Sequence, residues 1–170
     1  MNYVDTAFRQ LALAWKLYDY ALDGKINLDE LDRPLTFQGG GMVMVLPDKV
    51  LNTADDLILA MQNNLIITFG AAAITLNRCR EEAGHTLSAE IITEADQFIG
   101  VVYQIRNAFA HDIAEPRWNI NKLRYARVYE FGGIRIDLTS VGTKRFEYQD
   151  IGGPDVLFSM KTYAETYLWH

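Results

Sequence analysis

Apolar side chains recur every three or four residues in the first part of the chain, which is the spacing of one face of an α-helix. This pattern predicts a helix over about residues 5–23, with Gly24 as its stop. A second helix is predicted over about residues 53–83, with Thr53 as its N-cap. Residues 69–76 in its middle are apolar on most sides, so we expect this helix to lie centrally in a bundle.

The segment between these two helices, residues 25–52, has an irregular pattern. Pro34 and the glycine run 39–41 interrupt any helix, and residues 42–46 predict a short extended segment before Pro47. A glycine run can bind phosphate, but no Gly-Lys-Ser/Thr follows this one. A connector is therefore the simpler interpretation.

A third apolar stripe predicts a third helix, from Ser88 as its cap to about Asp112. The stripe consists of Ile91, Ala95, Phe98, Val102, Ile105 and Phe109. Beyond this helix, after Pro116, the pattern changes to short β-prone runs at residues 127–131, 134–138 and 144–148. Gly132 and Gly133 predict a hairpin turn between the first two runs. Pro154 predicts the first position of a final helix.

These elements together predict a mainly α fold, a bundle of about four helices with a small antiparallel β hairpin or meander before the last helix. The β part is expected at about residues 126–150. The chain of 170 residues contains no internal repeat or linker, so one domain over residues 1–170 is expected.

Charge and cysteine content narrow the function classes. The net charge of −6 argues against a protein that coats nucleic acid without sequence preference. Residues 106–127 differ in sign from the whole chain and carry a net charge of +3. Cys79 is the only cysteine, which excludes an intramolecular disulfide and fits a reducing cytoplasm. The start of the chain has no signal-peptide pattern, and the apolar run 65–76 is too short to span a bilayer, so no membrane partner is expected.

Candidate chemistry is concentrated in the segment Arg106-Asn107-Ala108-Phe109-Ala110-His111 at the end of the third predicted helix. Arginine binds phosphate, and histidine can accept a proton without a metal. Helical spacing places Asn107 and His111 on the face opposite the core stripe. We therefore expect this face either to be solvated, with an incidental histidine, or to meet a second copy of the chain and form a shared cleft. In such a cleft His111 could take the proton from a ribose 2′-hydroxyl, which DNA lacks.

The motif Arg106-Asn107-x-x-x-His111, at the end of a long helix in an α bundle, resembles the Arg-x4-6-His signature of the HEPN superfamily. The resemblance implies a HEPN-like fold and a dimeric, metal-independent endoribonuclease of a toxin–antitoxin or defence system. It implies that Arg106 and His111 are catalytic and that Asn107 orients or polarises the site. Some members carry, two residues after the histidine, a tyrosine that a partner enzyme modifies. Ile113 stands at that position, so this form of neutralisation is not expected.

Basic and aromatic residues follow the motif and are candidates for binding single-stranded RNA by phosphate contacts and base stacking. They are Arg117, Trp118, Lys122 and Arg124. The alternative is that Trp118 and Tyr125 pack the loop onto the bundle while the charges face water. No metal site or cofactor is expected, because no zinc, Walker or Gly-x-Ser-x-Gly pattern occurs.

Two functions therefore remain open. The first is a HEPN-type endoribonuclease with RNA as substrate, active as a homodimer and paired with a cognate antitoxin protein. The alternative is a HEPN-like module without catalysis, which binds RNA or nucleotides or serves helical dimerisation or regulation.

Overall fold

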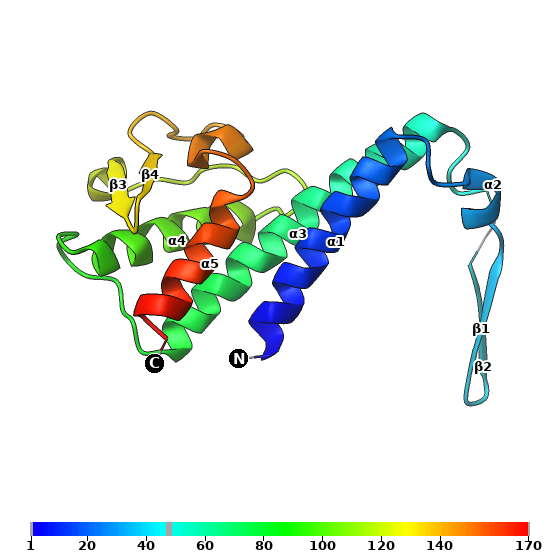
Figure 1. Cartoon of the computed structure of the whole chain (residues 1–170), viewed down its shortest axis with the longest axis horizontal. Coiled ribbons are helices and arrows are strands. Elements are labelled where there is room, and N and C mark those ends of the chain that lie inside the picture. Colours follow the sequence, from blue (N-terminus) through cyan, green and yellow to red (C-terminus); the bar gives the residue numbers. More distant parts are fainter. Residues whose placement is uncertain (1, 47–48, 170) are drawn as a thin grey trace. The chain divides into compact units, whose positions relative to one another are not determined.

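The computed structural model describes residues 2–46 and 49–169. Within them the fold is mainly helical, with five α-helices, two short 3-10 helices and two antiparallel hairpins (Figure 1). The elements are α1 (Asn2–Leu22), α2 (Leu28–Leu31), β1 (Leu35–Gly39), β2 (Met42–Leu46), α3 (Ala54–Glu82), α4 (Glu94–Ala110), η1 (Leu123–Tyr125), β3 (Val128–Phe131), β4 (Ile134–Asp137), η2 (Tyr148–Ile151) and α5 (Val156–Tyr167).

The residues group into two compact units. Unit 1 contains residues 1–10 and 66–170, and unit 2 contains residues 11–65. The helices α1 and α3 contribute to both units. The prediction of one domain therefore stays a prediction.

Local sequence signals set the ends of α1 and α3 as predicted. Gly24 adopts a positive φ of 63°, and the N–H of the next residue bonds to the Tyr20 carbonyl at 2.9 Å. This is the left-handed stop for which glycine is suited. At the start of α3, the Thr53 hydroxyl accepts from the Asp56 N–H at 3.1 Å, and the Asp56 carboxylate accepts from the Thr53 N–H at 2.9 Å. Such a capping box satisfies two N–H groups that have no partner inside the helix.

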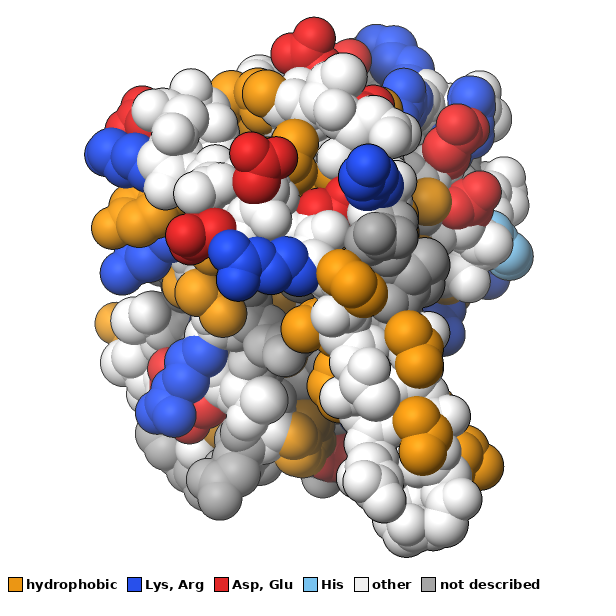
Figure 2. All heavy atoms as spheres, turned by 90° about the vertical axis from the view of Figure 1, so that its right-hand side faces the viewer, with side chains coloured by type: hydrophobic (Ala, Val, Ile, Leu, Met, Phe, Trp, Pro, Cys, Tyr) orange, Lys and Arg blue, Asp and Glu red, His pale blue; other side chains and the backbone are white. Residues whose placement is uncertain are grey.

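The segment 25–52 is more ordered than its sequence predicts. The strands β1 and β2 pair from Leu35↔Leu46 to Gly39↔Met42, so the expected extended segment is one half of a hairpin. Gly40 has a φ of 59°, which a two-residue hairpin turn requires. The hairpin leaves apolar side chains half exposed or more, as this side of the molecule shows (Figure 2): Leu35, Phe37, Met42, Val43, Met44 and Val45. Pro47 lies outside the described residues.

The helix α4 begins later than predicted. Thr93, not Ser88, is its N-cap, and Thr93 forms a capping box with Asp96. The Ser88 hydroxyl instead donates to the Asp96 carboxylate. The hydrogen bonds from Ser88 and then from Thr93 lower the pKa of Asp96 to about 2. The reciprocal acid three residues after Thr93 decides the cap, and Ser88 has no such partner at that spacing.

The prediction of a third strand at residues 144–148 is wrong. This segment bridges back to the residues that follow α4, through the pair Arg117↔Arg145 and a bond of 2.9 Å from the Phe146 N–H to the Pro116 carbonyl. It then turns into η2 instead of pairing with β4. The last helix begins at Val156, and Pro154 lies in the turn before it.

The core of unit 1 contains two groups of aromatic rings. The first joins α4, β3 and α5 through Phe98, Phe131 and Tyr163, with ring centroids 5.2 to 5.6 Å apart. The second lies beneath the end of α4 and consists of Phe69, Phe109, Phe146, Trp118 and Tyr148. The end of α4, which carries the candidate motif, is therefore fixed by large buried rings.

Gly70 allows α3 to approach this second group closely. A Cβ atom added at Gly70 would lie 2.5 Å from Phe109 Cδ1 and 2.9 Å from Ile113 Cγ1. In a helix interior Gly→Ala ordinarily raises the free energy of unfolding by about 1 kcal/mol. Overpacking a core lowers the free energy of unfolding by about 1–3 kcal/mol. We expect Gly70→Ala to lower the free energy of unfolding by about 1 kcal/mol in urea titrations. Gly41→Ala, which has open space around it, is the control; equal stability of both variants would contradict this packing.

The helix α3 is also long and apolar enough, by length and composition, to cross a membrane, and about a third of its most apolar stretch is buried. Core helices of soluble proteins share these properties. The expectation of no membrane partner therefore stays a prediction.

Candidate functional site

The last turn of α4 presents the three motif residues at different depths. Ala108 and Phe109 are 2% exposed and anchor the turn in the core. Arg106 and Asn107 are half-buried, and His111 is exposed. His111 is the C-cap of the helix, so its side chain stands where the chain leaves α4.

The chain turns back directly after His111. The Asp112 carboxylate accepts from the N–H groups of Ala114 and Glu115 at 2.9 and 3.0 Å, which closes an Asx turn. These bonds lower the pKa of Asp112. The Arg117 N–H then bonds to the Ala108 carbonyl at 3.0 Å and satisfies one of the acceptors at the helix end. The residues after the motif are thereby held beside it.

The polar face of α4 is covered for most of its length by its own chain, against the expectation that it meets solvent or a second copy. It packs against η1 and β3. Gly100 is buried, and a Cβ atom there would lie 3.1 Å from the Tyr129 ring. The Gln97 side chain accepts from the Glu130 N–H at 2.8 Å, and the Glu94 carboxylate accepts from the Gly132 N–H at 2.9 Å. The middle of this face is buried, whereas Thr93 and Glu94 at its start and His111 at its end are exposed.

An open pocket of about 390 Å³ lies at the His111 end of this face, within unit 1. We call it the cationic pocket. Its lining contains three cations, four carboxamides, one imidazole and two phenols: Arg106, Lys122, Arg124, Gln104, Asn107, Asn119, Asn121, His111, Tyr103 and Tyr125, together with Leu87. No carboxylate is among these lining residues. In a chain with net charge −6, this is a local site for an anion.

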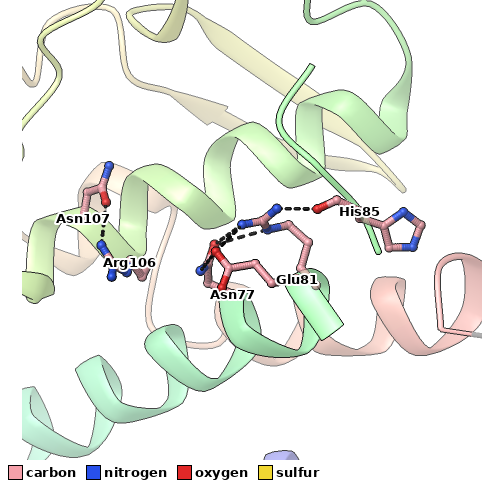
Figure 3. Close-up of polar contacts among 6 residues, drawn as sticks. Asn77, Glu81, His85, Arg106 and Asn107 are labelled. Atoms are coloured by element: carbon pink, nitrogen blue, oxygen red, sulfur yellow. Dashed lines mark hydrogen bonds and ion pairs between the residues drawn. The ribbon is translucent and has the colours of Figure 1, made fainter. Parts of the chain in front are cut away.

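The three cations keep donors for a ligand. One Arg106 N–H donates to Asn107 Oδ1 at 3.1 Å (Figure 3). Arg124 donates to the Ala89 carbonyl at 2.9 Å and to the Tyr125 hydroxyl at 2.8 Å, and its guanidinium stacks on the Tyr125 ring. Each guanidinium has five N–H groups, so these bonds orient the group without exhausting it. Within residues 2–46 and 49–169, no side-chain ion pair involves Arg106, Lys122 or Arg124.

Trp118 and Arg117 are placed differently from the other predicted RNA-binding residues. Trp118 is 1% exposed, donates from Nε1 to the Asp150 carboxylate at 2.7 Å, and packs on Phe146. The prediction that Trp118 stacks on bases is therefore wrong, and the alternative, that it packs the loop onto the bundle, describes it. Arg117 is exposed and lines a separate pocket of about 220 Å³, which shares His111 with the cationic pocket.

Arg80, which the sequence analysis does not single out, is a buried cation of α3. It is 3% exposed. Asn77 Oδ1 accepts from its Nε and Nη2 at 3.2 and 3.0 Å, Glu81 accepts from Nη2 at 2.8 Å, and the His85 carbonyl accepts from Nη1. Figure 3 shows these partners converging on the guanidinium. Burial lowers the pKa of Arg80, and the charge of Glu81 opposes this effect.

Arg80 lies near the phenols of Tyr103 and Tyr125, which line the cationic pocket. Its charge is largely balanced by the Glu81 carboxylate at 2.8 Å, so Arg80 supports the pocket wall without adding a free charge to it. The signal in the sequence is the polar run of residues 77–82, which includes Asn77, Arg80 and Glu81, at the end of an otherwise apolar core helix.

The arrangement as a whole can bind a phosphate and accept a proton at one place. Among the described parts of the chain, no group of three or more His, Cys, Asp or Glu side chains is placed to hold a metal ion. In comparisons with known proteins, no family model, no curated protein and no solved structure matches this chain.

Proposed function

We propose that the chain is a metal-independent endoribonuclease of the HEPN type, with the cationic pocket as its RNA site. The observation that carries the proposal is the lining of that pocket, in which an imidazole, three cations and four carboxamides occur without a carboxylate. Cations bind the phosphates of RNA, and carboxamides bind the edges of unpaired bases.

Arg106 and Lys122 bind the non-bridging oxygens of the phosphate to be cleaved. Arg106 is half-buried and oriented by Asn107, so its guanidinium loses less freedom on binding. Lys122 is exposed, lines the same pocket and adds a point charge. Both charges stabilise the additional negative charge that develops on phosphorus as it becomes five-coordinate.

His111 accepts the proton of the ribose 2′-hydroxyl at the mouth of the pocket. The 2′-oxygen then attacks the adjacent phosphorus, and the bond from phosphorus to the 5′-oxygen breaks. The products are a 2′,3′-cyclic phosphate and a 5′-hydroxyl, whose proton comes from water. The nucleophile belongs to the substrate and is held at high effective concentration, so the step itself needs no metal.

The proposal is tested by the chemistry of the products. A purified chain is expected to cleave single-stranded RNA equally well with and without EDTA, and to leave 2′,3′-cyclic phosphate ends. A single 2′-deoxy substitution at the cleaved nucleotide is expected to abolish cleavage there, because it removes the nucleophile. Cleavage that persists at the deoxy position, or that EDTA stops, would refute the proposal.

The proposal includes cytoplasmic RNA as substrate, a toxin or defence role, a homodimer and a cognate antitoxin protein. His111 is exposed at the open mouth of the pocket, where a second copy or an antitoxin could cover it. Light scattering measures whether the chain forms a homodimer. A loss of cleavage on adding the antitoxin protein measures whether the antitoxin binds. A strictly monomeric, fully active chain would remove the homodimer from the proposal.

A non-catalytic RNA-binding or nucleotide-binding module is the second candidate. The observation that favours it is the number of carboxamides, since four such groups serve recognition and none is needed for proton transfer. It predicts RNA binding at the cationic pocket with no new ends under any metal condition.

A further inference from the structure

Gln104 is a polar side chain of the cationic pocket with no role in the cleavage step. It lies on α4, is 2% exposed and lines the pocket. Within the described parts of the chain, its carboxamide forms no side-chain hydrogen bond. The other two buried polar residues, Asn77 and Arg80, bond to each other. Gln104 is therefore the exception among them.

The Gln104 carboxamide is largely withdrawn from bulk water and faces the pocket that it lines, so its acceptor and its donors are available to a ligand there. Its oxygen and its NH2 group can be satisfied from the pocket, the space that it lines. We propose that Gln104 is a specificity residue that binds the edge of one unpaired nucleobase, with adenine preferred. This inference rests on the proposed function, in that the cationic pocket takes RNA.

The carboxamide matches adenine because it carries an acceptor and a donor side by side. Its Oε1 accepts from the adenine N6 amino group while its Nε2 donates to N7, a bidentate pair. Guanine and uracil place a carbonyl oxygen where adenine carries the amino group, so the same orientation is repelled. Cytosine offers a similar pair but a smaller ring for stacking.

The residue before Gln104 supplies a surface for the ring of the base. Tyr103 is half-buried and lines the same pocket, and its ring centroid is 6.0 Å from that of Tyr125. The Tyr125 ring is itself covered by the Arg124 guanidinium. Tyr103 is therefore the aromatic wall on which a base can stack, next to the amide that binds its edge.

The test measures binding and does not depend on cleavage. The probes are 2′-O-methyl hexauridylates with one uridine replaced by A, G or C, followed by fluorescence anisotropy with the full chain. The native chain is expected to bind the A-containing probe about 10-fold more tightly than the all-U probe, in the range of one bidentate base contact. Gln104→Met, of similar length, is expected to remove this preference. Gln104→Glu, which only accepts, is expected to shift it toward guanine, whose Watson–Crick edge offers two donors, N1–H and the N2 amino group.

The controls separate base recognition from a structural role. Gln149→Met changes an exposed residue outside the cationic pocket and should keep the preference for adenine. The melting temperature of Gln104→Met should equal that of the native chain, because the substitution removes no hydrogen bond to the rest of the described chain. A lowered melting temperature with equal loss of affinity for all four probes would overturn the inference.

Each of the remaining outcomes also supports or overturns the inference. An unchanged preference in Gln104→Met would overturn the inference while RNA binding stands. If the native chain binds none of the probes, both the proposed function and this inference are refuted. Adenosine monophosphate that competes at the same concentration as the A-containing probe would show that the base belongs to a free nucleotide, which overturns the assignment to RNA. Preference without cleavage would support the inference and refute the nuclease.

Discussion

Replacing His111 with alanine is expected to lower the rate of RNA cleavage by about 10²- to 10⁴-fold, the usual contribution of a positioned general base. Among the side chains that line the cationic pocket, the imidazole is the one of a type that ordinarily serves as a general base, since the others are cations, phenols, carboxamides and Leu87. Its removal leaves the phosphate-binding cations in place. Affinity for a non-cleavable 2′-O-methyl oligonucleotide should therefore change little, and single-turnover cleavage is the measurement that reports the loss.

The same variant should leave the fold intact. His111 is exposed at the end of α4, and exposed substitutions usually change the free energy of unfolding by less than about 0.5 kcal/mol. His85→Ala is the matched control, because His85 contacts the Leu168 carbonyl and does not line the pocket. Added imidazole should restore part of the rate to His111→Ala alone. Cleavage at the native rate in His111→Ala would remove the proposed mechanism.

Much of the fold follows from local sequence signals, because those signals act within one turn of helix. A glycine stop sets the end of α1 and a capping box sets the start of α3 where they were predicted, although α1 begins at Asn2, earlier than expected. The start of α4 was missed by several residues although its signal, Thr93 with Asp96, is equally local. The third strand could not be predicted from alternation alone. Its residues pair with the segment after Pro116, and that choice depends on Phe146 packing against rings that are distant in sequence.

The candidate site was predicted in part. Helical spacing correctly separates Asn107 and His111 from the core stripe of α4. It could not reveal that a later hairpin covers the rest of that face, since bonds such as Gln97 to Glu130 join residues 33 positions apart. The cationic pocket is lined by residues of one chain, and a cleft shared between two copies stays a prediction.

Trp118 illustrates the same limit, and its substitution should produce the largest change in stability. A tryptophan beside arginines is typical of a base-stacking residue. Trp118, however, is buried, and its Nε1 donates to Asp150, a residue 32 positions away in the sequence. Trp118→Ala is expected to lower the free energy of unfolding by about 3–5 kcal/mol, as for other large buried rings. For a chain of this size, that lowers the melting temperature by about 10 °C or more.

The comparison of three variants distinguishes packing from RNA binding. Trp118→Phe keeps a ring against Phe146 but loses the bond to Asp150, so an intermediate melting temperature is expected. Leu123→Ala, at a nearby residue that is 90% exposed, should melt like the native chain. If Trp118→Ala instead melted normally and lost RNA affinity, the side chain would have to be accessible to bases. The buried Trp118 ring anchors the segment after α4, which continues to Lys122 and Arg124 in the lining of the cationic pocket. Removing the ring is therefore expected to make both cations less well positioned while leaving their charges unchanged.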